Sequence, residues 1–459
     1  MKKYNSRQEI LDTARAAVGK TFGELDKTGR INIGKGAPGS VVEESVFGYQ
    51  INSNAKADFE EFQLELKVLG FRRGKKGEIR AKERLVCNII DYMKEHELAF
   101  EESSFWKKSQ NMLLMTYEYL QNVEKKDFIL DEAAIFSFPK DDLEIIKQDR
   151  EKIIAKIKAG KAHEISEGDT LYLGACTKGK DSSSVRKQPF SDIMAKQRAY
   201  SLKQSYMTFV LSQYIYSNET LEHIIKDASQ LADRSFEEII TEKVSAYIGY
   251  TQKELKDMFG VVSTAKNLNE LLLAKMLGIN GKITASAEFQ KANIATKTIR
   301  LNAKNKIAES MSFSNFDFCK LVSEEWEESE VKEYFESKKF MFILFKENKN
   351  GEYVFDRIKF WNMPLEDLAE LERVWKETKK RINDGLNLEL VNGRLTNNLP
   401  KSNESTVAHV RPHAKKSAYK FDDVEHGDIV HDAKQLPDGR WLTKQCFWLN
   451  SKYVEKQVL

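Results

Sequence analysis

Phe62-Gln63-Leu64-Glu65-Leu66-Lys67-Val68 is the stretch that decides the fold. Apolar and polar side chains alternate along it, and this period of two predicts a β-strand with one face against a core. The residues on the expected core face are Phe62, Leu64, Leu66 and Val68. Glu65 and Lys67 therefore share the opposite face, roughly 6 to 7 Å apart along the strand.

The sequence predicts two helices before this strand, and further strands with one long helix after it. Ser6 and Glu9 form a capping box for a helix over 6–18, and Pro38 and Gly48 bracket a second helix over 38–47. A polar connection over 49–57 precedes the strand, and a basic, glycine-rich turn over 70–77 follows it. Further strands are expected over 85–90, 112–117 and 171–176, with a long helix over 141–159. The predicted fold class is α/β, a mixed sheet flanked by helices.

Composition excludes several classes of protein. A chain of 459 residues is long enough for two or three domains, and 73 basic against 70 acidic residues leave a net charge of only +3. No apolar run approaches the length of a membrane span, and the N-terminus carries no secretory segment. The four cysteines lie far apart, which favours reduced thiols over a disulfide or zinc framework. A soluble, cytoplasmic protein is expected.

The two halves of the sequence resemble each other. A shift of 230 positions aligns Gly48 with Gly278 and Lys67 with Lys297, and a shift of 225 aligns 139–160 with 364–385. An ordered series of matches at a nearly constant shift predicts two tandem copies of one fold. We expect the copies at 1–225 and 233–459, joined between Ser217 and Asp233.

Asp58, Glu65 and Lys67 form a pattern that suits phosphodiester hydrolysis. Asp58 precedes the strand and can fold back beside Glu65, so that two carboxylates offer hard oxygen ligands to Mg²⁺. Lys67 can orient or help deprotonate a water and can offset charge on the phosphorus. The alternative is an ordinary pair of surface charges, because Glu and Lys are abundant in this chain.

Several longer stretches carry a family resemblance: 44–48 (ESVFG), 171–179 (LYLGACTKG), 188–193 (QPFSDI) and 409–413 (HVRPH). With Asp58 and Glu65-Leu66-Lys67, they resemble the MutH-like DNA endonucleases. The whole chain is most similar to the type II restriction enzymes of that family that cut at GATC, the Sau-three-A type. This resemblance implies a Mg²⁺-dependent nuclease with Asp58 and Glu65 as metal ligands and Lys67 as the catalytic lysine.

Two more active-site residues follow from the resemblance. Glu44 stands where the family has a further metal-binding carboxylate, with Glu43 as the neighbouring alternative. Lys108 matches a second active-site lysine, with Lys107 as its competitor.

The resemblance also marks residues that face DNA. MutH has an Arg-Pro-Lys turn for the major groove, and the matching place here is Cys176-Thr177-Lys178, so that only the lysine keeps the basic role. The positions expected to contact DNA in the first half are Thr177, Lys178, Arg186, Ser201 and Lys203.

The second half has lost most of the site. The same shift places Ala274 on Glu44, Glu288 on Asp58 and Ala295 on Glu65, so two of three carboxylates are missing. An Arg-Pro-His turn persists, and the expected regulatory DNA contacts are Arg411, His413 and Lys444. The alternative is a purely structural lobe. His409 and His413 are not expected to bind metal, because Pro412 between them disfavours a helix.

The function predicted is that of a type II site-specific deoxyribonuclease cutting double-stranded DNA at GATC with Mg²⁺, its second domain acting as an allosteric or positioning lobe. A monomer or a DNA-induced dimer is expected, with a cognate methyltransferase in the same system but no stable complex with it. The alternatives are a MutH-like mismatch-repair nicking enzyme and a non-catalytic DNA-binding regulator.

Overall fold

The computed structural model describes residues 3–34, 36–49, 56–179, 183–217, 221–263, 267–307 and 309–459. The chain divides into two compact units. Unit 1 comprises Met1–Ile240 and Leu277–Ile294, and unit 2 comprises Thr241–Met276 and Ala295–Leu459. Most of the polar connection expected over 49–57, and part of the junction expected over 217–233, lie outside the described residues.

Unit 1 is built on two sheets. The first has the order β2-β1-β4-β5, in which β1 runs parallel to β4 and the other neighbours are antiparallel. Its strands are β1 (Glu65–Arg73), β2 (Ile79–Ala81), β4 (Asn111–Glu118) and β5 (Leu130–Ser137). The second sheet has the order β3-β9-β6, with β3 (Leu85–Ile89), β6 (Leu173–Thr177) and β9 (Arg198–Leu202). A separate ribbon pairs β7 (Val185–Gln188) with β8 (Ser191–Lys196).

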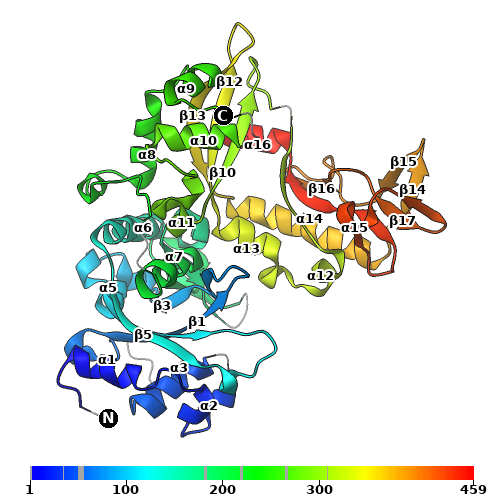
Figure 1. Cartoon of the computed structure of the whole chain (residues 1–459). Coiled ribbons are helices and arrows are strands. Elements are labelled where there is room, and N and C mark those ends of the chain that lie inside the picture. Colours follow the sequence, from blue (N-terminus) through cyan, green and yellow to red (C-terminus); the bar gives the residue numbers. More distant parts are fainter. Residues whose placement is uncertain are drawn as a thin grey trace. The chain divides into compact units, whose positions relative to one another are not determined.

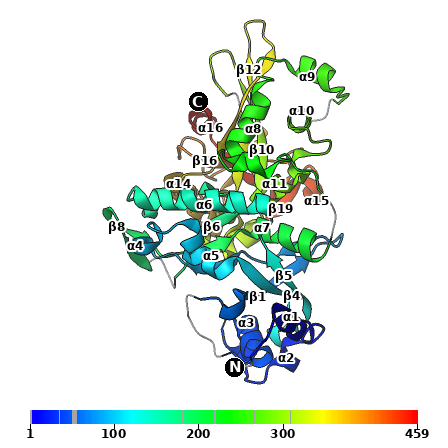
Figure 2. The same cartoon turned by 90° about the vertical axis from the view of Figure 1, so that its left-hand side faces the viewer.

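Helices flank both sheets of unit 1 (Figures 1 and 2). They are α1 (Arg7–Arg15), α2 (Phe22–Leu25), α3 (Ala37–Val41), α4 (Tyr92–Glu95), α5 (Ser104–Ser109), α6 (Lys140–Lys158), α7 (Gln204–Phe209) and α11 (Ala287–Ala292). The side chains of α1 to α3 share a core cluster with β1, β4 and β5. Ser6 accepts the N–H of Glu9 and so caps α1, but the Glu9 carboxylate accepts the N–H of Asn5, so only one half of the predicted capping box forms.

Unit 2 repeats this order of elements. Its main sheet is β10-β12-β13, and a second sheet is β11-β21-β16, where unit 1 has β1-β4-β5 and β3-β9-β6. The strands are β10 (Ile294–Leu301), β11 (Met311–Asn315), β12 (Lys339–Glu347), β13 (Tyr353–Trp361), β16 (Ala408–Pro412) and β21 (Gln445–Leu449). The smaller strands are β14 (Leu388–Val391), β15 (Arg394–Asn397), β17 (Tyr419–Phe421), β18 (Val424–His426), β19 (Ala433–Gln435) and β20 (Trp441–Thr443).

The described α-helices of unit 2 are α9 (Gln252–Phe259), α10 (Leu268–Met276), α12 (Phe318–Ser323), α13 (Glu330–Ser337), α14 (Leu365–Asn383), α15 (Ile429–Asp432) and α16 (Ser451–Val458), while α8 (Phe236–Ser245) crosses the boundary between the units. Four of them, α12, α13, α14 and α16, contribute side chains to one buried core. In Figure 1, α14 lies alongside α13. Trp375 of α14 and Trp326 lie at the centre of the core cluster.

Local details recur at the expected spacing. Gly19 donates its N–H to Leu130, and Gly249 donates to Phe355. The long helices α6 and α14 each have 19 residues and a proline at the N-cap. These recurrences agree with the internal similarity of the sequence.

The division into units differs from the expected boundary, because Leu277–Ile294 packs with the first half. Lys291 of α11 is fully buried, and its Nζ lies 2.6 Å from Asp142 Oδ1 at the start of α6. Glu288 accepts the N–H groups of Ile224 and Ile225 at 3.1 Å. These charged contacts hold α11 in unit 1, beside α7 and one end of α6 (Figure 2).

The deciding stretch itself begins later than predicted. Phe62 ends a single 3₁₀ turn, and Gln63 has a left-handed backbone with φ 48°, so β1 starts at Glu65. Leu64 and Leu66 are buried as expected, but Phe62 is only half-buried. The basic stretch from Gly70 also continues the strand to Arg73, and the turn is confined to 74–78. No helix in the described ranges is both long and apolar enough to cross a bilayer.

Removing the buried charge partner of Lys291 should destabilise unit 1. Asp142→Ala leaves the ammonium without its closest carboxylate and should lower the free energy of unfolding by about 3 kcal/mol. That is the low end of the usual range, because Asp141 Oδ2 remains 3.9 Å from Lys291. Chemical denaturation measures the effect, with Lys158→Ala on the exposed end of α6 as control. An Asp142→Ala protein as stable as the wild type would contradict this role.

Candidate active site

Glu65 is the centre of a cluster of charged side chains at the start of β1. It is only 2% exposed. Lys67 Nζ lies 2.8 Å and Lys108 Nζ 3.4 Å from the same Glu65 oxygen, Oε1. Burying a carboxylate is costly unless it is paired and hydrogen-bonded, and the two ammonium groups supply that pairing.

Asp58 is brought beside Glu65 by a tight loop. Its backbone N–H donates to Glu65 Oε2 at 3.3 Å, and the N–H of Leu66 donates to Asp58 Oδ2 at 3.0 Å. The left-handed residue Gln63 lets the chain reverse, and Phe59 pairs with Leu64 to close the loop. Asp58 and Glu65, the first residue of β1, thus come together although seven positions separate them in the sequence.

A third carboxylate reaches the cluster from the helical segment after α3. Burial, and next the charge of Asp58, raise the pKa of Glu43 to about 7. Burial and the charge of Glu65 likewise raise the pKa of Asp58 to about 6. Two buried acids whose pKa values are raised by burial and by neighbouring carboxylates are typical of a site prepared for a cation.

Glu44, the predicted residue, faces elsewhere. Its carboxylate lies 2.9 Å from Arg30 Nε and accepts the hydroxyl of Thr28 at 3.0 Å. The hydrogen bond from the Arg30 guanidinium lowers the pKa of Glu44. Residues 42–46 form a π-helical turn, whose wider spacing changes which of two neighbouring side chains faces β1. We therefore replace Glu44 with Glu43 in the candidate site.

Lys67 and Lys108 are the two cations of the site. Burial lowers the pKa of Lys67, but the charge and hydrogen bond of Glu65, together with Cys87 and Asp58, outweigh burial, and the pKa is raised. Lys107, the competing residue, is exposed and stands on the other side of α5, whereas Lys108 is largely buried against Glu65. Cys87 also lies near Lys67, but burial raises its pKa to about 11 and keeps the thiol neutral.

The donor set fits a hard divalent cation that keeps part of its water shell. Among the described residues, no three acidic, His or Cys side chains converge closely enough to hold a metal unaided. Mg²⁺ needs only one or two carboxylates when substrate phosphate and water complete its shell. Asp58 and Glu65 can supply these two, with Glu43 close by.

The segment that contains Asp58, Glu65 and both lysines matches a known protein family. The family described as "DNA mismatch repair enzyme MutH" matches residues 47–149, which include β1, α5, β4 and β5. Over its full length, the chain is 38% identical to the type II restriction enzyme Sau3AI of Staphylococcus aureus, covering 100% of this chain and 99% of that enzyme. The chain belongs to the MutH-like type II restriction endonucleases. The resemblance inferred from the sequence is thereby confirmed.

In this endonuclease, three of the predicted DNA-facing residues are exposed. Thr177 ends β6, and Lys178 follows it with its N–H bonded to the carbonyl of Gln197 at 2.8 Å. Arg186 lies on β7, where its Nε donates to Gln197 Oε1 at 2.9 Å. Their side chains are available to a ligand, and the backbone that carries them is fixed by hydrogen bonds.

The other two are buried. Ser201 is inaccessible within β9, the central strand of its sheet. Lys203 is 4% exposed, and its ammonium donates to the carbonyl of Thr170. Lys203 follows β9 and precedes α7, so it holds that junction together and does not face DNA.

The endonuclease's unit 2 carries an aromatic and cationic cluster at the end of β16. The Arg411 guanidinium lies 4.1 Å from the centre of the Trp448 ring, and the His413 ring lies 5.4 Å from it edge to face. Arg411 and His413 are exposed. The sequence did not single out Trp448, although it pairs with His409 across the two strands. His409 is buried, and its Nδ1 lies 2.6 Å from Asn450 Oδ1.

Lys444 is not equivalent to Lys203. It lies between β20 and β21, whereas Lys203 follows β9, the counterpart of β21 in sheet order. The ammonium of Lys444 donates to the carbonyl of His431. The sequences Lys203-Gln204 and Lys444-Gln445 look alike, but they stand at opposite ends of equivalent strands.

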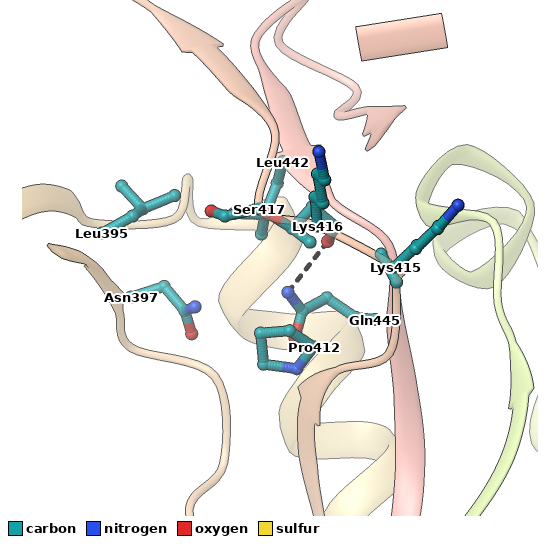
Figure 3. A pocket seen from close by; sticks show the side chains of 10 residues that line it. Leu395, Asn397, Pro412, Lys415, Lys416, Ser417, Leu442 and Gln445 are labelled. Carbon is teal, nitrogen blue, oxygen red and sulfur yellow. Dashed lines mark hydrogen bonds between the residues drawn. The ribbon is translucent and has the colours of Figure 1, made fainter. Parts of the chain in front are cut away.

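A cavity of about 200 Å³ opens beside Pro412, the last residue of β16 (Figure 3). Lys415, Lys416 and Ser417 form one wall, and Pro412 and Gln445 form another. Gln445 is fully buried, and its Nε2 donates to the carbonyl of Thr443 at 2.9 Å. Two exposed lysines beside the cavity make its mouth electropositive.

Two of the three positions that the shift aligns with Glu44, Asp58 and Glu65 carry alanine. Ala274 is buried in α10, and Ala295 follows the first residue of β10. Glu288, the one remaining acid, is engaged with the N–H groups of Ile224 and Ile225 and lies 3.6 Å from His223.

Charge crowding in the site should be visible in its stability. Because the pKa of Asp58 is raised to about 6, its ionised form destabilises the fold. Asp58→Asn keeps an acceptor for Leu66 and should raise the free energy of unfolding in EDTA at pH 8 by about 1 to 3 kcal/mol. The gain should shrink as pH falls from about 6 and vanish below about 4, where the acid is protonated in both states. Denaturation across this pH range, with Asp12→Asn on the surface of α1 as control, measures it. A loss of stability at pH 8 would contradict the crowding.

Proposed function

We propose that this chain hydrolyses double-stranded DNA at GATC sites, using Mg²⁺ held by Asp58 and Glu65. The observation that carries the proposal is the cluster in which two lysines share one buried oxygen of Glu65 while Asp58 is hydrogen-bonded beside it. The full-length similarity to a type II restriction enzyme supports it. GATC is the sequence expected from the resemblance of the whole chain.

The chemistry divides among the residues by charge. Asp58 and Glu65 bind the cation, which supplies an activated water and a Lewis acid at the phosphate. Lys67, which pairs with Glu65 in the free protein, would orient the attacking water through its ammonium group and help to relay the proton of that water away. Lys108 offsets the negative charge that builds on the phosphate oxygens.

Glu43 acts as the third acid of the site. Its raised pKa of about 7 lets it carry a proton at neutral pH until a cation or a water requires its charged form. Thr177, Lys178 and Arg186 contact the DNA, with Lys178 facing a base edge or a phosphate.

Glu43 and Glu44 are a matched pair for testing the site. Glu43→Gln should slow cleavage of a supercoiled GATC plasmid by roughly 10- to 100-fold, because it removes a charge that supports the metal-binding acids. Glu44→Gln should cleave within about twofold of the wild type, since its carboxylate binds Arg30. Asp58→Ala and Glu65→Ala should abolish cleavage, and Lys67→Ala should reduce it by roughly 10² to 10⁴. If Glu44→Gln slowed cleavage and Glu43→Gln did not, Glu44 and not Glu43 would belong to the site.

The second candidate activity is strand-directed nicking, which the match to the MutH family favours. The purified chain alone should convert a GATC plasmid to linear products with both strands cut. Accumulation of nicked circles that need a partner protein for any further reaction would support the nicking enzyme instead. A chain that binds GATC DNA but leaves it intact in Mg²⁺ would be the non-catalytic regulator.

Unit 2 serves in this proposal as a second DNA-binding lobe. It offers Arg411 stacked on Trp448, the exposed His413, and a cavity flanked by Lys415 and Lys416. Its lack of a carboxylate set explains why it would bind without cutting. The alternative is a structural lobe without a ligand.

Coupling between the two units predicts a dependence on the number of sites. A plasmid with two GATC sites should be cut faster than one with a single site, and an uncleavable GATC duplex should speed the single-site reaction. Arg411→Ala should remove this difference, because it deletes a base interaction of roughly 1 to 3 kcal/mol. Lys452→Ala, on the exposed face of α16, is the control. Equal rates on both plasmids would make unit 2 a scaffold.

A further inference from the structure

Two lysines remain where unit 2 has lost its carboxylates. Lys297 lies on β10 and Lys338 directly follows α13. The shift of 230 that aligns the two halves places them on Lys67 and Lys108, the two lysines that share Glu65 in unit 1. The position of Glu65 itself is taken by Ala295. The cationic half of the site has thus been retained without its acidic half.

The surroundings of these lysines are aromatic and carbonyl groups. Lys297 Nζ donates to the carbonyl of Ser312 at 3.2 Å and lies 5.1 Å from the centre of the Phe313 ring. Lys338 Nζ lies 5.2 Å from the centre of the Tyr334 ring, and the Phe313 and Tyr334 rings are 5.6 Å apart. Across the described residues, Lys297 forms no ion pair with a carboxylate.

The electrostatics are the opposite of those in unit 1. Burial lowers the pKa of Lys297, and burial together with the charge of Lys297 lowers the pKa of Lys338. The pKa of Lys67 is raised instead, because Glu65 stands beside it. Two half-buried cations that destabilise each other gain stability when an anion binds between them.

The acid that the shift of 230 aligns with the acidic site of unit 1 does not fill this role. Glu288, which the shift aligns with Asp58, is held by the N–H groups of Ile224 and Ile225, and hydrogen bonds from these groups and His223 outweigh burial and lower its pKa. It therefore stays charged where it is and is committed to unit 1.

We propose that Lys297 and Lys338 form a metal-free binding site for one phosphate of a DNA backbone. The site rests on the proposed role of unit 2 as a DNA-binding lobe and names its phosphate contact. A phosphodiester presents the monoanionic oxygens that two ammonium groups bind through charge-assisted hydrogen bonds. Without carboxylates, the site cannot hold the cation that hydrolysis needs, so the bound phosphate stays intact.

Restoring the missing acid is the sharpest test. Ala295 is half-buried, and Ala295→Glu places a carboxylate where Glu65 stands in unit 1. It should pair with the lysines and exclude the phosphate. Ala295→Gln has nearly the same size and no charge, so it controls for packing.

The full chain is titrated in EDTA with a short GATC duplex, and native mass spectrometry and anisotropy count the bound duplexes. Wild type and Ala295→Gln should bind two, and Ala295→Glu should bind the second at least about tenfold more weakly. Its slope of log affinity against log salt for that duplex should fall by about 1, because the one phosphate that the two lysines bind is then lost. Lys297→Ala should show a smaller fall, because Lys338 still faces the phosphate.

The outcomes separate this site from the function on which it rests. If all variants bind a second duplex with the wild-type affinity and slope, the phosphate site is wrong while unit 2 remains a DNA-binding lobe. If Ala295→Gln and Ala295→Glu weaken binding of the second duplex equally, packing and not charge is responsible, and the phosphate site is likewise wrong. If the wild-type chain binds a single duplex, both proposals fail together.

Discussion

A buried carboxylate is the constraint on which this molecule depends. Glu65 has almost no contact with water, and it is tolerated there because Lys67 and Lys108 share one of its oxygens and a backbone N–H binds the other. The parallel pairing of β1 with β4 fixes Glu65, and α5, which leads into β4, delivers Lys108. The loop closed at Phe59 and Leu64 brings Asp58. The charges of the site thus come from three parts of unit 1: Glu65 and Lys67 from β1, Lys108 from α5 and Asp58 from the loop before β1.

Unit 2 shows what the same framework does when that carboxylate is absent. Its strands and long helix follow the order of unit 1, yet Ala295 replaces Glu65 and the two lysines remain. The segment that would carry its aspartate, α11, instead packs with unit 1 through Lys291 and Glu288. The absence of one acid thus accompanies a change from a site suited to a cation to one suited to an anion.

The alternation of residues around Glu65 predicted that Leu64 and Leu66 are buried and that Glu65 and Lys67 belong together. It could not predict that Glu65 is itself buried, since period two alone assigns it to a solvated face. The exchange of Glu44 for Glu43 depends on a π-helical turn, which has no short-range sequence signal. Ser201 and Lys203 were expected to face DNA, but both are buried, Ser201 in a central strand and Lys203 at the junction that follows it. Such burial is set by neighbouring elements far away in sequence. Family resemblance supplied the function, and only the three-dimensional contacts decided between adjacent residues.

Iron-directed cleavage of the polypeptide tests the central claim most directly, that the metal of this endonuclease sits between Asp58 and Glu65. Fe²⁺ replaces Mg²⁺ in oxygen-ligand sites, and with ascorbate and peroxide it cuts the backbone next to its ligands. Mass spectrometry of the fragments should place the cuts around Asp58 and at the start of β1, and excess Mg²⁺ should suppress them. Cuts confined to another region, such as the segment around Glu288, or the absence of cuts near Asp58 and Glu65, would contradict the account.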